Sequence, residues 1–209
     1  MDCALIALAT GKRARTLKNL RDYLETIEPQ SIYYHFWGSL LRPRFEDAEY
    51  HNDFAGWAAH SLHDTMTAER LGIVNPLAFQ TMEELRQELM DIIDERIDEL
   101  EVLPASSKDS QFEFISSDMV VFRSDTVIRT AAELLKVIPT LSLGSIFYHF
   151  IDARRRTEVS HDDFSTWLQQ YECAEAVQGL AEIDPFFTSL SALRQEITEI
   201  LTKHLSGDL

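Results

Sequence analysis

The side chains in this sequence with the clearest capacity for chemistry are a histidine and an aspartate that each occur twice, His35 with Asp53 and His149 with Asp163. A carboxylate that contacts an imidazole fixes the ring's tautomer and raises its basicity, which gives a general base or an oriented ligand. The alternative is structural: His35 bonds a backbone carbonyl or Asp53 caps a helix. Because repeated polar residues beside aromatic ones more often complete a core, the structural role is the favoured interpretation.

Both histidines lie in a motif that the chain contains twice, Ser-Ile-Tyr-Tyr-His-Phe at residues 31–36 and Ser-Ile-Phe-Tyr-His-Phe at residues 145–150. Further blocks recur in the same order, at offsets that fall from 114 (145 − 31) at this motif to 108 (193 − 85) near the end of each copy. Matching blocks in one order indicate a tandem duplication. We therefore divide the chain into a first repeat (1–103), a linker (104–111) and a second repeat (112–209), packed either as one compact domain or as two.

Aromatic residues accompany the pair in both repeats. Trp57 and Trp167 follow the aspartates, whereas Tyr34 and Tyr148 precede the histidines. Tyr34 lies about 200° around a helix from Ile32, a residue expected in the core, so its hydroxyl could serve an opening between the repeats. These four aromatic residues join the histidines and aspartates as candidate ligand-binding residues.

Arginines directly follow both copies of the motif. Arg42 and Arg44 flank a proline in the first repeat, and Arg154 and Arg156 lie in a run of three arginines in the second. Planar guanidinium groups bind anions through paired hydrogen bonds, so these arginines are candidates to hold a small anionic ligand. Ion pairing with nearby acidic residues is the favoured alternative, since most surface charges are solvated or paired.

A metal site has weak support. His60 and His63 have a spacing that presents two ligands on one helical face, and Asp64 follows them. Their counterparts in the second repeat are Gln170 and Cys173, and no established metal or nucleophile motif is present. We therefore expect no metal, no cofactor and no nucleophilic catalysis.

Helices are the elements expected to position these residues, about four in each repeat. Apolar residues at helical spacing predict a first helix over residues 14–27 and its copy over 126–138. A second helix then begins at Ser31 or Ser145, because serine caps helix N-termini. A capping box begins the last helix, over residues 81–101 in the first repeat.

The third helix of each repeat is expected to begin at Asp53 or Asp163 and to fade near a glycine further along. Strand alternation of useful length is missing, except around Phe112 and Phe114. The sequence therefore predicts an all-α protein, made of two homologous helical repeats related by pseudo-twofold symmetry.

Composition limits the classes of partner. The chain of 209 residues has 19 basic and 35 acidic residues and a formal net charge of −16. Nucleic acids and anionic membranes bind proteins that neutralise phosphates with Lys and Arg, so neither is an expected partner. Two cysteines at unrelated places in the repeats fit a reduced, cytoplasmic protein. The apolar run at residues 3–9 lacks a basic leader and a cleavage pattern, so it is not expected to be a signal peptide.

The repeated motifs resemble a known family. The blocks Ser-Ile-Tyr-Tyr-His-Phe and Asn-Asp-Phe-x-x-Trp, followed by Ser-Ile-Phe-Tyr-His-Phe and Asp-Asp-Phe-Ser-x-Trp, are similar to a prokaryotic family known only as a domain of unknown function. The resemblance covers nearly the whole chain and implies a bacterial cytoplasmic protein. It supplies no activity, cofactor or catalytic residue.

These observations favour a non-enzymatic, helical binding or regulatory module that engages a protein partner or a small anionic ligand between its repeats. One alternative is an enzyme of unknown reaction that uses the repeated histidine and aspartate. Another is a sugar-binding accessory protein, since exposed aromatic residues beside Asp and His suit stacking on a carbohydrate. That alternative requires Tyr34 and Trp57 to be exposed.

Overall fold

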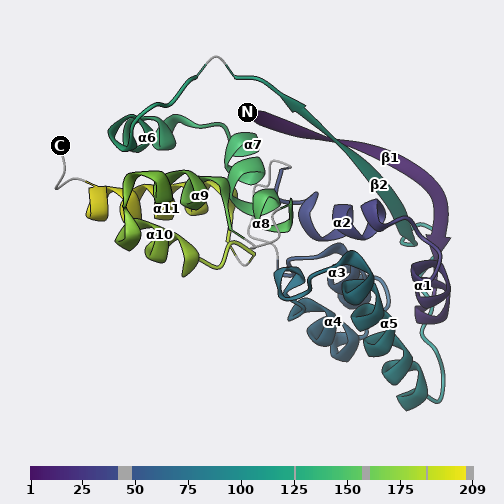
Figure 1. Cartoon of the computed structure of the whole chain (residues 1–209). Helices are drawn as coiled ribbons and strands as arrows, with labels where there is room; N and C mark the ends of the chain where they lie inside the picture. Colours follow the sequence, from purple (N-terminus) through teal and green to yellow (C-terminus); the bar gives the residue numbers. More distant parts are fainter. Residues whose placement is uncertain (42–48, 125, 157–160, 187, 206–209) are drawn as a thin grey trace. The chain divides into compact units, whose positions relative to one another are not determined.

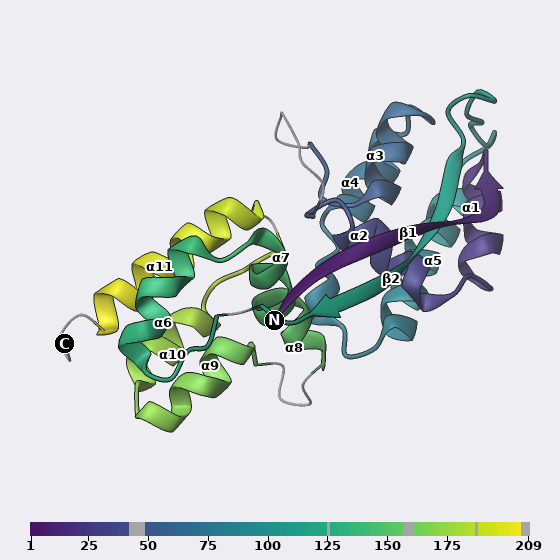
Figure 2. The same cartoon turned by 90° about the horizontal axis from the view of Figure 1, so that it is seen from above.

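The chain combines helices with a two-stranded sheet (Figure 1), in a computed structural model that describes residues 1–41, 49–124, 126–156, 161–186 and 188–205. Strands β1 (Asp2–Ala14) and β2 (Phe112–Phe122) pair as an antiparallel sheet and lie side by side in Figures 1 and 2. The Thr10 hydroxyl donates to the Phe114 carbonyl oxygen at 2.6 Å.

The all-α prediction is therefore wrong, and the description of the chain as a helical repeat fails with it. The alternation of buried Phe112, exposed Glu113 and buried Phe114 is a true strand pattern, although it is short. In β1 most side chains are exposed, so no apolar alternation marks it. A strand of this kind is stabilised by a partner about a hundred residues away, and local sequence carries little information about such pairing.

The chain forms two compact units. Unit 2 comprises Leu5–Asp118, and unit 1 comprises Met1–Ala4 together with Met119–Leu209. Each unit therefore includes a strand segment from the opposite repeat: residues 112–118 of the second repeat belong to unit 2, and Met1–Ala4 of the first repeat belong to unit 1.

Unit 2 carries the helices of the first repeat. They are α1 (Leu17–Leu24), α2 (Pro29–Trp37), α3 (Asp53–His60), α4 (Thr65–Gly72), the short 3₁₀ helix η1 (Pro76–Ala78) and α5 (Met82–Glu99). The capping box is confirmed, since the Glu84 amide donates to Thr81 Oγ1 and the Thr81 amide donates to the Glu84 carboxylate. The expected third helix is instead two helices, α3 and α4, which pack against each other.

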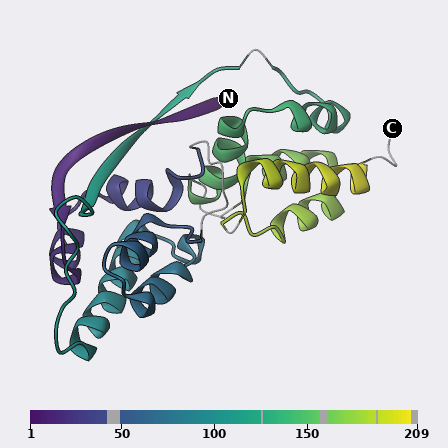
Figure 3. The ribbon, with the colours of Figure 1, turned by 180° about the vertical axis from the view of Figure 1, so that it is seen from behind.

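Unit 1 carries the helices of the second repeat. They are α6 (Ala131–Val137), η2 (Ile138–Thr140), α7 (Leu143–Ile146), η3 (Phe147–Asp152), α8 (Ala153–Arg156), α9 (Asp163–Leu168), η4 (Gln169–Tyr171), α10 (Ala174–Ala181) and α11 (Leu190–Leu205). Helices α10 and α11 lie side by side, as Figure 3 shows. Element η3 is a π-helix, a form that occurs frequently at functional sites.

The serines of the repeated motif do not cap helices as predicted. Helix α2 begins at Pro29, and α7 is capped by Ser142. Ser31 and Ser145 lie inside their helices, where each side chain donates to a backbone carbonyl of the strand segment from the other repeat. Their role is to fix that strand.

A glycine lets the strand approach closely in unit 1. A Cβ atom at Gly144 would collide with the Asp2 carboxylate and with the Cys3 carbonyl oxygen. Any larger residue at position 144 would therefore displace the start of β1 from α7.

No helix in the described part of the chain is long and apolar enough to cross a membrane.

The core of unit 2 depends on β2, which generates a first prediction. Phe114 is 1% exposed, whereas Phe122 on the same strand is 47% exposed. We expect Phe114→Ala to lower the free energy of unfolding by about 3–5 kcal/mol, the usual cost of removing a buried phenyl ring. Urea unfolding followed by circular dichroism measures the loss. The matched control, Phe122→Ala, should change the free energy by less than about 1 kcal/mol, and equal losses would contradict the burial of β2 in unit 2.

Candidate functional site

The histidine and aspartate of the first repeat are paired in unit 2. His35, on α2, lies 2.9 Å from an oxygen of Asp53, on α3, measured from the ring Nδ1. The His35 side chain is 3% exposed and that of Asp53 is 33% exposed. Asn52, and not Asp53, caps α3, so the Asp53 carboxylate is available to the ring.

The second nitrogen of His35 is bonded as well. The backbone N–H of Ile115, on β2, donates to His35 Nε2 at 3.1 Å. Since an amide can only donate, Nε2 must be an acceptor and the proton is on Nδ1, where it faces Asp53. The rings of Phe112, Phe114 and Phe54 enclose the imidazole. In unit 2 the pair therefore joins two helices to a strand, although neither contact of the structural interpretation is formed: His35 accepts from a backbone N–H, and Asn52 caps α3.

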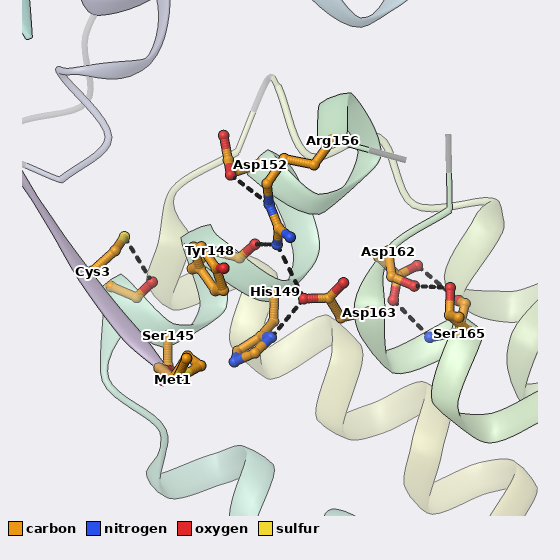
Figure 4. A network of polar contacts seen from close by, with 12 residues as sticks. Met1, Cys3, Ser145, Tyr148, His149, Asp152, Arg156, Asp162, Asp163 and Ser165 are labelled. Carbon is orange, nitrogen blue, oxygen red and sulfur yellow. Dashed lines mark hydrogen bonds and ion pairs between the residues drawn. The ribbon is translucent and has the colours of Figure 1, made fainter. Parts of the chain in front are cut away.

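The equivalent pair in unit 1 has an additional partner. His149 Nδ1 lies 2.8 Å from an oxygen of Asp163, and Arg156 donates to the same oxygen at 3.1 Å. Figure 4 shows His149 and Arg156 converging on this carboxylate from opposite sides. Arg156 also donates to Asp152 at 2.8 Å and to the Tyr148 carbonyl oxygen at 3.0 Å. The guanidinium thus fixes Asp163, which in turn fixes the histidine ring.

These contacts set the charge of the carboxylate. Burial alone would raise the pKa of Asp163, but the hydrogen bond from His149 and the positive charge of Arg156 outweigh it and hold the pKa below its ordinary value. Asp163 is therefore ionised at neutral pH and accepts from the Nδ1 side of the ring. A carboxylate in this position leaves Nε2 as the reactive nitrogen of His149.

His149 lines a cavity of about 360 Å³, and Figure 4 shows Asp163 at Nδ1, on the side of the ring away from Nε2. None of the residues that the structure describes donates a hydrogen bond to Nε2, and the His149 side chain is 21% exposed. The cavity walls are mainly apolar, with a few hydroxyl groups, and lie entirely within unit 1. They comprise Met1, Ser124, Thr126, Ile128, Leu134, Leu141, Ser145, His149, Asp163, Phe164 and Trp167.

A comparison of the strand contacts shows why the two histidines differ. The offset that aligns Ser145 with Ser31 also aligns Ile115 with Met1. Accordingly, Ser31 Oγ donates to the Ile115 carbonyl oxygen at 2.9 Å, and Ser145 Oγ donates to the Met1 carbonyl oxygen at 2.5 Å. The carbonyl contact is thus common to both units, whereas the amide contact to the histidine is formed in unit 2 alone among the described residues.

The arginines considered as candidates to hold an anion have internal partners where they are described. Arg154 donates to the carbonyl oxygens of Ile183 and Leu180 at 3.0 and 2.8 Å, and its guanidinium lies 4.3 Å from the centre of the Phe150 ring. Arg156 binds Asp152 and Asp163, as described above. Arg42 and Arg44 lie outside the described residues.

The four aromatic candidates occupy different environments. Tyr34 and Trp57 are buried, with exposed fractions of 5% and 7%, so in unit 2 they present no face on which a sugar could stack. The Trp57 indole N–H donates to the Ser110 carbonyl oxygen at 2.9 Å. Tyr148 lies beneath the guanidinium of Arg156, whereas Trp167 forms part of the cavity wall.

The histidines considered for a metal do not form a site. Among the residues the structure describes, no group of three or more His, Cys, Asp or Glu side chains is arranged to hold a metal ion. Asp64 instead caps α4, accepts from Thr67 Oγ1 at 2.6 Å and pairs with Arg96 at 3.1 Å.

Cys3, at the start of β1, is a buried and unreactive thiol. Burial, together with the negative charges of Asp2 and Asp152, raises its pKa to about 12. The thiol therefore stays protonated at neutral pH, and it donates to the Gly144 carbonyl oxygen at 3.3 Å. Its role is to hold the strand to α7.

Sequence reasoning identified the paired residues but missed the groups that separate the two sites. Ser145 and Ser31 were interpreted as helix caps, and Phe112 was not connected to the first repeat. The available signal is that the serine is identical in both copies of the motif.

The lowered pKa of Asp163 generates a prediction about acid stability. Its pKa is lower in the folded state than the ordinary value of 3.8, so its contribution to stability is full above that value and is lost as the pH falls through the folded pKa. We expect Asp163→Asn to cost about 1–2 kcal/mol at pH 5 to 7. The difference from the parent protein should shrink below about pH 4.

Urea unfolding at a series of pH values measures this difference. Glu196→Gln, which removes an exposed carboxylate from α11, is the matched control and should cost little at any pH. A cost for Asp163→Asn that grows on acidification would contradict the assigned contacts.

Comparisons with known proteins find a family and a similar solved structure. The model of a family of unknown function, DUF5752, matches residues 1–202. A solved structure, "The structure of OrfY from Thermoproteus tenax", is similar at 26% sequence identity and a TM-score of 0.81, and the match covers 98% of this chain and 94% of that chain. No curated protein matches. The chain therefore belongs to the DUF5752 family of unknown function.

Proposed function

We propose that this protein is a binding module whose ligand site is the cavity beside His149 in unit 1. The observation that carries the proposal is the contrast between the two histidine–aspartate pairs. In unit 2 both ring nitrogens of His35 are bonded within the unit. In unit 1, Nδ1 of His149 is fixed by Asp163, none of the described residues is hydrogen-bonded to Nε2, and the residue lines the cavity.

The size and lining of the cavity favour a small molecule. Ligand pockets in proteins have volumes of roughly 300–1,000 Å³ and combine apolar walls with a few placed polar groups. The cavity of about 360 Å³ lies in this range, and Phe164, Trp167 and Leu134 provide apolar walls around the imidazole. A ligand of modest size would fit this volume.

The polar groups favour a ligand that is neutral and carries a hydrogen-bond donor. In its neutral form with the proton on Nδ1 facing Asp163, His149 offers an acceptor at Nε2. Arg154 and Arg156 are already bonded to carbonyl oxygens and carboxylates of unit 1, which weakens the case for an anionic ligand here. Binding of a protein partner and a regulatory role stay predictions from the sequence, as do a prokaryotic origin and a cytoplasmic location.

Catalysis is a second candidate, because a histidine fixed by a carboxylate at Nδ1 is also the arrangement of a general base. Nε2 of His149 would then take a proton from the bound molecule and not merely accept a hydrogen bond from it. Exchange of ligand protons with deuterated solvent, dependent on His149, would distinguish this reaction from binding alone.

The proposal predicts a ligand effect that depends on His149 and not on His35. A thermal-shift screen would test neutral aromatic and aliphatic amides, sugars, sugar phosphates and nucleotides against the parent protein and two variants, His149→Asn and His35→Asn. Asparagine can retain the contact to the aspartate but lacks an atom at the Nε2 position. A ligand at 100 times its dissociation constant should add about 2.7 kcal/mol, a shift of roughly 5–10 °C.

We expect the shift to persist in His35→Asn and to disappear in His149→Asn. The His35 variant should itself be less stable by about 1–3 kcal/mol, because the Ile115 N–H loses its acceptor. Hits that bind both variants equally would place the ligand elsewhere, and the absence of any hit would count against a small-molecule site.

A further inference from the structure

Unit 2 can be compared with the cavity of unit 1, because equivalent residues surround His35 and a side chain fills the space between them. The residues around His149 include Phe164 and Trp167, whose counterparts around His35 are Phe54 and Trp57. In unit 2 the ring of Phe112 lies among these three side chains. Unit 1 therefore has an open cavity at the place that an aromatic ring occupies in unit 2.

The geometry of Phe112 shows what this arrangement of walls accepts. Its ring stacks on Phe54, with centroids 5.0 Å apart and planes 20° apart. It meets Trp57 edge-on at 5.7 Å and lies 4.6 Å from the centre of the His35 ring. Offset stacking and edge-on contacts of this kind are favoured between aromatic rings beyond the area they bury. The walls thus form an aromatic slot.

The same strand also provides the polar contact of the slot. Three residues after Phe112, the backbone N–H of Ile115 donates to His35 Nε2 at 3.1 Å. The Phe112 ring and the Ile115 N–H therefore contact the same imidazole. The ring packs beside the imidazole, and the N–H donates to Nε2. In unit 1 the corresponding residues, Phe164, Trp167 and His149, all line the cavity.

A second ring position lies next to the first. The ring of Phe114 meets that of Phe112 edge-on at 4.9 Å, and its carbonyl oxygen accepts from Thr10 Oγ1. The residue that aligns with Thr10 in the second repeat is Ser124, which also lines the cavity and also carries a hydroxyl group. The lining of the cavity in unit 1 therefore carries a hydroxyl group at the position equivalent to Thr10.

From this comparison we infer that the ligand of unit 1 is a small, neutral aromatic molecule that carries an N–H donor, such as an aromatic amide. Its ring takes the place of Phe112, stacked on Phe164 and beside Trp167, and its N–H donates to His149 Nε2. This inference rests on the proposed binding function and names its ligand class.

Four amides would separate the two parts of the inference. Phenylacetamide carries both the ring and the N–H donor. Cyclohexylacetamide replaces the aromatic ring by an aliphatic one of similar size, N,N-dimethyl-phenylacetamide lacks the N–H, and acetamide lacks the ring. Titrations of the isotope-labelled full chain, followed by NMR, would give a dissociation constant for each and would locate the perturbed residues.

We expect phenylacetamide to bind most tightly, with the largest shifts at His149, Phe164 and Trp167. Loss of one hydrogen bond, or of one aromatic stacking contact, predicts dissociation constants roughly 2- to 13-fold larger for the dimethyl and cyclohexyl analogues. Acetamide should not bind measurably. Phe164→Leu should remove the preference for phenyl over cyclohexyl, whereas Phe54→Leu, the matched change in unit 2, should leave it unchanged even though it lowers stability.

Other outcomes would overturn the inference in distinguishable ways. Equal affinity for the phenyl and cyclohexyl amides would contradict an aromatic slot, and equal affinity with and without the N–H would contradict the contact to Nε2. If ligands of another class bind through His149 while these amides do not, the ligand class is wrong and the binding function stands. If only a peptide with the sequence of residues 112–116 binds, the site takes a protein segment and not a small molecule.

Discussion

The hydrogen bond from the serine of the repeated motif to a strand carbonyl is the contact on which both units depend. Ser31 and Ser145 are buried inside helices, and each donates to the strand segment of the opposite repeat. A buried hydroxyl without a hydrogen-bond partner lowers the stability of the folded state. The serine of each helix therefore depends on the strand carbonyl, and the strand is held in place by the serine. This contact gives each unit residues from both repeats.

The same contact places a strand backbone beside each repeated histidine, and the two copies then diverge. In unit 2, β2 continues past the serine contact so that Ile115 bonds the imidazole and Phe112 covers it. Desolvating both ring nitrogens is acceptable there because each is bonded. In unit 1 the carboxylate partner is reinforced by Arg156, and the histidine lines a cavity. One duplicated site thus yields a filled core and an open pocket.

Much of the candidate site could be predicted from the sequence, because the two copies in a duplicated chain show which polar residues are identical in both. The recurrence of His35 with Asp53 and of His149 with Asp163 singled out these residues, and their pairing, one of two interpretations of that recurrence, is present in both units. The difference between the two pairs could not be predicted. It depends on which strand backbone lies beside each ring, a contact between residues far apart in the chain.

The sheet was missed for the same physical reason. The last helix of the first repeat has a capping box and an apolar stripe, which are local signals, and its start was predicted correctly. Strand β1 has few buried side chains and is stabilised by pairing with β2, so its own sequence has no clear period. The prediction of a serine cap was wrong because the Ser145 hydroxyl donates to a strand backbone that the local sequence does not indicate.

The measurement that tests this account most directly is the NMR detection of hydrogen bonds at the two histidines. Scalar coupling between nitrogens across a hydrogen bond identifies donor and acceptor in a labelled sample without ligand. The account predicts a coupling between the Ile115 amide nitrogen and His35 Nε2, and none between any backbone nitrogen and His149 Nε2. A coupling from an amide of the chain to His149 Nε2 would contradict it, because the protein itself would then close the site.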